Sequence, residues 1–339
     1  MLVAIVLLLS ARRRRRLINT AYYVKVDVGL LSESPWSRIK SSTRDDTWVS
    51  AISIRLAPFA RLVDITTPYL VRGRTGHPNL SPVDVVGLTV MWLTSRLLQS
   101  DLSLIFGQSP SIICRELQRG RTALRHALRI DHDSRIEWPD APTMQRFAFM
   151  VQNKRHELRD VFGFMDGVHF PIFNPDNPNE QNAYYNGWVR EVSVTNVLVF
   201  TPDGCIALAR FNCPGSWHDS IVALPIYDVL NDPTYTPPPY RIIADSAFVS
   251  TDRCVTCLTM TQVAIASRAA LRMNAAVVSV RQAAEWGNGA LQRTFARLKL
   301  PLSADADTRA SLLHVVFHLY NLRTRLTGFN QIKSVFCDN

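Results

Sequence analysis

From residue 161 onward, the chain alternates short apolar runs with turn signals, and this pattern requires a fold that contains a β-sheet. The run VFGFM precedes Asp166, a β-branched stretch covers residues 192–200, and the run RIIA precedes Asp245. Short apolar runs bounded by turn residues are typical of strands, and TPDG at 201–204 is a hairpin signal. We predict a strand at each run, with both aspartates at strand ends.

Helices are predicted after these strands. Apolar residues recur at helical spacing over residues 219–230, 280–298 and about 311–326. The order strand, hairpin, helix, strand, helices predicts an α/β domain over residues 155–339, with a mixed sheet flanked by helices. Sheets of this kind carry functional groups at the ends of their strands.

The preceding segment, residues 61–145, has the pattern of a small helical, helix-turn-helix-like domain. Ser81-Pro82 is a helix start, and a short turn with Gly107 leads to a helix that begins at Pro110. Helix, short turn, helix is an arrangement that enters DNA grooves. The last helix supplies three candidate phosphate contacts, Arg115, Arg119 and Arg125.

Two features of this segment leave other interpretations open. Gly120 lies in the middle of the last helix and is unfavourable there. The basic face could also be the solvated side of a plain helical bundle. Residues 131–145, with two prolines and several aspartates, are expected to be a linker or a domain boundary.

Residues 1–60 show no clear period and are expected to be variable or partly disordered. The formal net charge of the chain is +10, and the five arginines of Arg12–Arg16 supply half of it. A basic excess fits a nucleic-acid partner. The arginine run is either a nuclear-localisation patch, which would place the protein in the nucleus, or a solvated tail. The apolar stretch before it is too short to span a bilayer, so we expect no stable membrane association.

Three acids are candidates for a catalytic and metal-binding site: Asp166, Asp245 and Glu285. Hard divalent cations prefer oxygen ligands. Three convergent carboxylates can hold two Mg²⁺ or Mn²⁺ ions, one to activate a water or 3′-hydroxyl and one to stabilise the leaving oxygen during attack on a phosphodiester. The chain has 28 acids, so spacing alone does not single these three out.

Local motifs around the acids make the choice specific. The segments are GFMDGVHFPI, QNAYYNGW, VLVFTPDGCIALARFNCPGSWHDS, IIADSAF and RQAAEWGNGALQRTFARLKLPL. Together they make residues 163–302 resemble the DDE superfamily endonuclease domain of PIF/Harbinger-type transposases, most closely the forms found in fungi and oomycetes. The later segment HLYNLRTRLTGFNQI extends the resemblance to about residue 332.

This resemblance implies an RNase H-like fold, the metal-binding triad Asp166, Asp245 and Glu285, and a metal-dependent DNA endonuclease. It also implies that the protein works as a homo-oligomer on DNA, and the family often uses a second, Myb-like DNA-binding protein. The chain departs from the family pattern at Ala244, at Asn288-Gly289 and at Tyr320. None of these changes removes a ligand. A catalytically inactive, domesticated DNA-binding or regulatory protein on the same scaffold is therefore the alternative.

Other residues near the motifs have two interpretations each. His218 and Asp219 could support the metal site or could cap the next helix and satisfy its loop, and His169 could lie at the rim of the site or simply in a strand. Trp188 and Trp217 could stack on bases or belong to the core. Arg293, Arg297 and Lys299 could line a DNA channel or form a solvated face. A hydrolase of small phosphoesters is a further alternative, and it would lack affinity for DNA.

Overall fold

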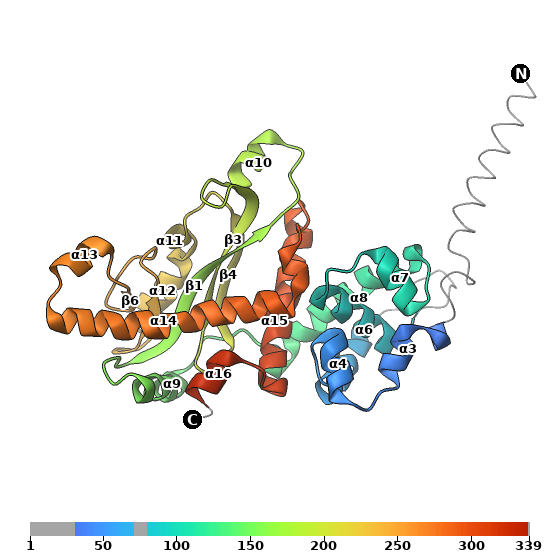
Figure 1. Cartoon of the computed structure of the whole chain (residues 1–339), viewed down its shortest axis with the longest axis horizontal. Helices are drawn as coiled ribbons and strands as arrows, with labels where there is room; N and C mark the ends of the chain where they lie inside the picture. The colour runs from blue at the N-terminus through green and yellow to red at the C-terminus, as the bar shows by residue number, and fades with distance from the viewer. Residues whose placement is uncertain (1–30, 71–79, 338–339) are drawn as a thin grey trace, which may run out of the picture. The chain divides into compact units, whose positions relative to one another are not determined.

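A computed structural model of the chain describes residues 31–70 and 80–337 (Figure 1). The chain divides into two compact units, residues 1–126 and 127–339. The Arg12–Arg16 run and the apolar stretch before it lie outside the described residues, and the expectations about them stay predictions. Within the described ranges, no helix is long and apolar enough to cross a membrane.

The first unit is helical. Its elements are η1 (Leu31–Glu33), α3 (Pro35–Lys40), α4 (Asp45–Ile52), α5 (Leu56–Thr66), η2 (Thr67–Tyr69), α6 (Pro82–Thr94), α7 (Gln99–Phe106) and α8 (Pro110–Ile130), whose last turn extends into the second unit.

Four aromatic side chains form the centre of this unit. The ring of Trp36 contacts those of Trp48, Phe59 and Phe106 at centroid distances of 6.0, 6.3 and 5.0 Å. The expectation that the chain is variable or partly disordered up to residue 60 is therefore wrong for residues 31–60. Each helix there is too short to show a period, and the packing of the aromatic rings orders the helices instead.

Helices α6, α7 and α8 agree with the helices predicted over residues 81–130. Ser81 caps α6 by accepting a hydrogen bond from the backbone N–H of Asp84, and Gly107 ends α7 in the left-handed conformation. Helix α8 continues through Gly120 because this residue faces α6, where a Cβ atom would lie 2.0 Å from Thr89 Oγ1. The use of these helices as a helix-turn-helix stays a prediction.

The second unit is mixed α/β, as predicted. Its elements are η3 (His132–Ser134), α9 (Ala141–Lys154), β1 (Val161–Pro171), α10 (Pro178–Tyr184), β2 (Tyr185–Asn186), β3 (Glu191–Phe200), β4 (Ile206–Pro214), α11 (Asp219–Val222), α12 (Leu224–Asn231), β5 (Arg241–Ala244), β6 (Cys254–Thr256), α13 (Met260–Ile265), α14 (Arg268–Thr294), η4 (Ala296–Lys299), α15 (Ala306–Thr327) and α16 (Gln331–Phe336).

Two of the predicted boundaries differ from this organisation. The division between the units falls at residue 126, inside the region 61–145 that we expected to be one domain. The segment expected to be a linker already contains the start of α9. Asp140 caps this helix by accepting from the backbone N–H of Thr143, so its acid and prolines are helix-start signals.

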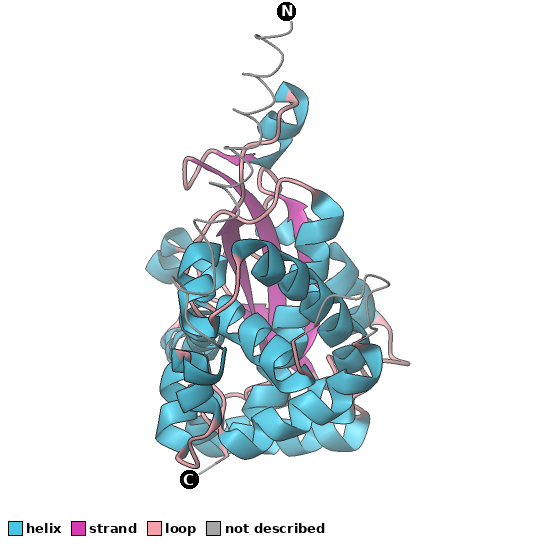
Figure 2. Cartoon of the chain, turned by 90° about the vertical axis from the view of Figure 1, so that its right-hand side faces the viewer, coloured by secondary structure: helices cyan, strands magenta, loops and turns pink. Residues whose placement is uncertain are grey.

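The strands form one six-stranded sheet of mixed direction, drawn in magenta in Figure 2. Its order is β2-β3-β1-β5-β6, and β4 also pairs with β3. Strand β3 runs antiparallel to β1, β2 and β4, whereas β5 is parallel to β1 and β6 is parallel to β5. The hairpin predicted at TPDG joins β3 to β4, with Gly204 at φ +83°.

Helices cover both faces of the sheet, so its central strands are buried on two sides. On one face, Phe147 of α9 and Ile226 of α12 share a core with Phe162, Val197 and Ile242 of the sheet. On the other face, α14 runs along the sheet in front of β1 and β3 (Figure 1), and α15 and α16 pack beside it. Rigid strands of this kind hold whatever side chains follow them in fixed places.

Candidate active site

Asp166 in β1 and Asp245 directly after β5 lie at the same level of two neighbouring parallel strands. Met165 of β1 is in register with Ala244 of β5, so the two aspartates are the next residue on each strand. Asp245 lies at a strand end, as predicted. Asp166 does not, because β1 continues to Pro171 through its pairing with β3. What ends at Asp166 is only the pairing between β1 and β5, and this suffices to bring the two acids side by side.

Glu285 reaches the same region from helix α14. Gly287 lets this helix approach the sheet, because a Cβ atom there would lie 2.7 Å from the ring of Phe200 on β3. The side chain of Glu285 is half exposed, and that of Asp245 is 40% exposed. The motif around Glu285 therefore forms a helix whose glycine sets the distance between the acid and the strands.

Arg281, one helical turn before Glu285, lies among the acids. Its Nη2 atom is 2.8 Å from Glu285 Oε1, and its Nη1 atom is 4.0 Å from Asp245 Oδ2. Burial lowers the pKa of Arg281, but the negative charges of Asp245, Glu285 and Asp166 outweigh this effect and raise it. The guanidinium is thus the cation that the acidic cluster holds in this structure.

Asn288, three residues after Glu285, binds the remaining acid. Its Nδ2 atom donates to Asp166 Oδ2 at 3.0 Å and to the carbonyl of Gly167 at 3.2 Å. Burial raises the pKa of Asp166 to about 6, although hydrogen bonds from Gly167 and Asn288 and the charge of Arg281 act in the opposite direction. The carboxyl of Asp166 is therefore ionised at neutral pH but protonated in mild acid.

Asp219 belongs to the same charged cluster. Its Oδ1 atom is 3.9 Å from His169 Nε2, and a Cβ atom on Gly167 would lie 2.2 Å from its Oδ2 atom. Burial raises the pKa of Asp219, the charges of His169 and His218 lower it, and the charge of Asp245 raises it. A glycine is needed at position 167 because the carboxylate of Asp219 approaches the backbone beside Asp166 so closely that no Cβ atom fits there.

The capping interpretation of the His218-Asp219 pair does not hold. His218 is the N-cap residue of α11, its side chain makes no capping hydrogen bond, and Asp219 is already the first helical residue. The carboxylate of Asp219 is directed at β1 instead. His169 lies in β1, where its Nδ1 atom is 3.1 Å from the hydroxyl of Thr195, so it connects the strand to Asp219.

The donor chemistry of this cluster suits a divalent cation. Its acids already surround a positive charge, and two buried oxygens, Asp219 Oδ1 and Asn288 Oδ1, have no hydrogen-bond partner. The positions differ from the prediction. In the described part of the chain, no three His, Cys, Asp or Glu side chains form a group that could hold a metal ion. Asp245 and Glu285 contact Arg281 instead, and Asp166 is hydrogen-bonded to Asn288.

The predicted DNA contacts fall into two groups. Arg115 and Arg125 on α8, and Arg293 and Lys299 near the end of α14, are exposed. Arg119 is not available, because its side chain is 16% exposed and its Nη2 atom lies 2.8 Å from Oε2 of the fully buried Glu116. Its role is to neutralise a buried acid. The prediction that Arg119 contacts phosphate is therefore corrected, because the packing of α8 engages its side chain with Glu116.

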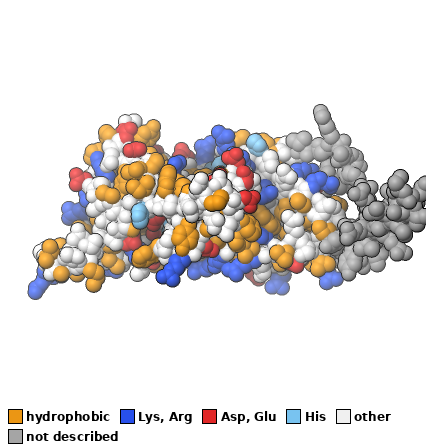
Figure 3. Space-filling view, turned by 90° about the horizontal axis from the view of Figure 1, so that it is seen from above, with side chains coloured by type: hydrophobic (Ala, Val, Ile, Leu, Met, Phe, Trp, Pro, Cys, Tyr) orange, Lys and Arg blue, Asp and Glu red, His pale blue; other side chains and the backbone are white. Residues whose placement is uncertain are grey.

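Arg297 is also a weaker candidate than its position in the sequence indicates. It lies in η4, is partly buried, and burial lowers its pKa. On the face drawn in Figure 3, Lys and Arg side chains form several small separate groups and no continuous patch. The strongest candidates for contact with DNA are the exposed Arg115 and Arg125 in α8, and the exposed Arg293 and Lys299 in the second unit.

Sequence reasoning missed two residues of the site, Arg281 and Asn288. Both lie on the face of α14 that carries Glu285, at spacings of four and three residues, so a helical periodicity argument centred on Glu285 would have found them. Asn288 was noted only as a departure from the family pattern. Its buried amide in fact holds Asp166.

Comparison with known proteins gives one match. Residues 165–321 match a family described as DDE superfamily endonuclease. The matched segment contains Asp166, Asp245 and Glu285 together with Arg281 and Asn288, and it supports membership of this domain in that superfamily and a nuclease activity. No curated protein and no solved structure matches the chain.

Proposed function

We propose that this protein is a divalent-metal-dependent DNA endonuclease of the transposase type, with Asp166, Asp245 and Glu285 as its metal-binding and catalytic residues. The observation that carries the proposal is the register of β1 and β5, which sets Asp166 beside Asp245, with Glu285 joined to the pair through Arg281. This arrangement lies inside the segment that matches DDE superfamily endonucleases.

The topology supports the RNase H-like fold that the resemblance to PIF/Harbinger-type transposases implies. The three long antiparallel strands β1, β3 and β4 come first in the chain. The parallel strands β5 and β6 are then added beside β1, and the long helix α14 crosses the sheet. The first acid comes from the central strand, the second from the adjacent parallel strand and the third from the helix. Such a distribution would bring three acids from distant parts of the chain to one region of the sheet.

Two divalent cations, when bound by the three acids, would supply the positive charge that activates the attacking oxygen and stabilises the leaving oxygen of a phosphodiester. The residues of the chain prepare this site. Asn288 holds the carboxylate of Asp166 in place. Arg281 offsets part of the negative charge of Asp245 and Glu285 and would have to move if a cation took its place. Above about pH 6, Asp166 is ionised and able to act as a ligand.

The first unit would hold the DNA. Helix α8 presents Arg115 and Arg125 to solvent, where guanidinium groups can bind phosphates. The exposed Arg293 and Lys299 would contact the DNA near the cut. A homo-oligomer on DNA and a Myb-like partner protein belong to this proposal through the resemblance alone, and action in the nucleus belongs to it through the Arg12–Arg16 run.

The test is nicking of supercoiled plasmid with Mg²⁺ or Mn²⁺. We expect the wild-type protein to nick the plasmid only with a divalent cation. Asp245→Ala should abolish nicking, whereas the exposed Asp252→Ala, on the loop before β6, should leave it intact. Cutting that survives Asp245→Ala contradicts the assignment of the site.

One observation favours the alternative of a non-cutting DNA-binding or regulatory protein. Arg281 already supplies one positive charge to the acids, so part of the negative charge of the cluster is offset without a metal. In the nicking experiment, this alternative is supported if the protein binds plasmid DNA but leaves it intact with every divalent cation tried.

A further inference from the structure

A pocket of about 760 Å³ opens beside the acidic cluster and is lined mainly by aromatic and neutral polar side chains. Its wall includes His169 and Asp219, which contact the cluster, and Ala247, two residues after Asp245. Its size lies within the range of pockets that hold small organic groups. The cutting chemistry proposed above uses none of its aromatic residues.

The aromatic residues of the pocket are exposed to an unusual degree. The side chain of Trp188 is 94% exposed, and those of Tyr185 and Trp217 are 45% and 44% exposed. A tryptophan as exposed as Trp188 contributes little to the stability of the fold, since a tryptophan side chain stabilises a protein by being buried. These rings therefore suit a ligand with a flat face.

The backbone fixes both walls, so the aromatic rings stand on defined turns. Asn186 Oδ1 accepts hydrogen bonds from the backbone N–H groups of Trp188 and Val189 at 3.0 and 3.3 Å. On the other wall, a Cβ atom on Gly215 would lie 2.3 Å from the carbonyl of Ser193, so this loop is tightly seated on the sheet. The pocket is a built feature of the fold.

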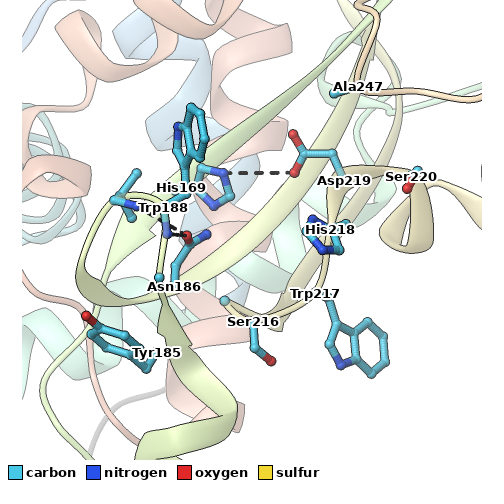
Figure 4. A pocket seen from close by; sticks show the side chains of 13 residues that line it. His169, Tyr185, Asn186, Trp188, Ser216, Trp217, His218, Asp219, Ser220 and Ala247 are labelled. Atoms are coloured by element: carbon cyan, nitrogen blue, oxygen red, sulfur yellow. Dashed lines mark hydrogen bonds and ion pairs between the residues drawn. The ribbon is translucent and has the colours of Figure 1, made fainter.

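Figure 4 shows how the two walls face each other. His169, Asn186 and Trp188 lie on one side, and Ser216, Trp217 and His218 lie on the other. Asp219 points across the gap toward His169 along the dashed line, which marks their 3.9 Å contact. His169 and Asp219, which connect the pocket to the acidic cluster, thus form part of its lining.

The lining of the pocket identifies the part of a nucleotide that it suits. None of the described residues that line it is a lysine or an arginine, so a phosphate would find no counter-charge. Aromatic faces bind any base by stacking. Amide, hydroxyl and imidazole groups such as those of Asn186, Ser216 and His218 can pair with the edge of a base.

We propose that this pocket holds one unpaired nucleobase of the DNA strand next to the phosphodiester at the acids. The inference rests on the proposed function for the identity of the ligand. A phosphodiester at Asp166 and Asp245 brings the adjacent nucleotide to the mouth of the pocket. A base can enter only where it has left its stack, so the preferred substrate has an unpaired nucleotide at the cut site.

The test is a binding experiment in EDTA, where no cutting occurs. The probes are two DNA duplexes of the same sequence, one fully paired and one with a single unpaired 2-aminopurine. We expect the wild-type protein to bind the unpaired probe more tightly and to quench its fluorescence. Trp188→Ala and Trp217→Ala should each weaken binding of the unpaired probe by roughly 10-fold and leave the paired probe unchanged.

Tyr235→Ala is the matched control, because Tyr235 is an exposed aromatic residue (57%) that does not line the pocket. The proposal is overturned if the tryptophan variants bind both probes as the wild type does, or if they weaken both probes equally. Weakened binding of a protein partner without any effect on either probe would show a protein-docking surface instead, and would also overturn it.

The nicking experiment separates this inference from the proposed function. If nicking of the plasmid depends on Asp245 while the tryptophan variants bind both probes normally, the proposed nuclease function is supported and the base pocket is contradicted. If the tryptophan variants lose the unpaired probe while no cation supports nicking, the pocket stands and the cutting activity falls.

Discussion

Arg281 is a basic residue that acts on all three candidate acids. It contacts Glu285 and Asp245, and its charge also acts on Asp166. A cation bound by the same acids would compete with its guanidinium for the same negative charge. The side chain therefore sets both the stability of the protein without metal and the ease with which metal enters.

This competition gives a test with Arg281→Gln. Without divalent cations, we expect the variant to lose about 1 kcal/mol of unfolding free energy, because the acids lose a partly exposed counter-charge. Added Mn²⁺ should raise the melting temperature of the variant more than that of the wild type. Arg272→Gln, an exposed position on the same helix, is the control and should behave as the wild type. An equal effect of Mn²⁺ on all three proteins would argue against the competition.

Asp166 gives the cluster a dependence on pH. Its pKa of about 6 in the folded protein lies above the ordinary value of 3.8, so the folded state binds the proton more tightly than the unfolded state. The stability that this group contributes is complete below about pH 4 and is lost as the pH rises through about 6.

We therefore expect Asp166→Asn to remove this loss. In urea unfolding with EDTA, the difference in unfolding free energy between the wild type and the variant should shift against the wild type from about pH 4 to pH 6. A difference that stays constant over this range would mean that the pKa of Asp166 is not raised. Titrations of groups that do not interact with Asp166 cancel in the comparison.

At the scale of elements, helix α14 determines where the third acid and its neighbours lie. Arg281, Glu285 and Asn288 share one face of the helix, and Gly287 sets how closely it packs on Phe200 of β3. The closely spaced pair Gly287 and Gly289 offers a matched comparison, because only the first faces the sheet.

Gly287→Ala should push α14 away from the sheet. Its Cβ atom would lie 2.7 Å from the Phe200 ring, and overpacking of this kind costs about 1–3 kcal/mol. We expect this loss in chemical unfolding, together with reduced plasmid nicking. Gly289→Ala meets only Arg293 at 3.6 Å and should be neutral or stabilising, since alanine favours helices. Equal unfolding free energies for the two variants would rule out the proposed spacing role.

The elements also show which parts of the fold the sequence could predict. The apolar runs and the TPDG turn predict the strands and their hairpin, because both depend on local patterns. The continuation of β1 past Asp166 depends on its pairing with β3, and the balancing of the acids by Arg281 depends on tertiary contacts. Local patterns carry neither kind of information. The spacing of apolar residues predicts the helix that carries Glu285, but Glu285 itself could be singled out only through the resemblance of its motif.

At the scale of the whole chain, helix α8 of the first unit carries one arginine with a structural role and another that we propose to bind DNA. Arg119 and Arg125 are two similar residues with different surroundings. Arg119 neutralises the buried Glu116, and Arg125 is exposed to solvent. The sequence could not distinguish them, because the burial of Glu116 depends on how α8 packs within its unit.

The full chain should therefore respond differently to the two substitutions. Arg119→Ala should lower the unfolding free energy by about 2 kcal/mol, because Glu116 keeps only the second contact from Arg115. Arg125→Ala should keep the stability of the wild type but weaken DNA binding and reduce the salt dependence of the affinity by about one unit. Unchanged DNA affinity and salt dependence in Arg125→Ala would remove α8 from the proposed DNA surface.

The central claim is that Asp166, Asp245 and Glu285 form one cutting site, and Glu285 is the acid whose assignment depends most on its motif. The most direct test is the Mn²⁺-dependent rate of plasmid nicking by Glu285→Gln, with the exposed Glu180→Gln of α10 as the control. We expect Glu285→Gln to slow nicking by more than about 100-fold, the upper range for losing a residue that only supports a metal ligand, and Glu180→Gln to cut normally. Nicking by Glu285→Gln at the wild-type rate would contradict the claim.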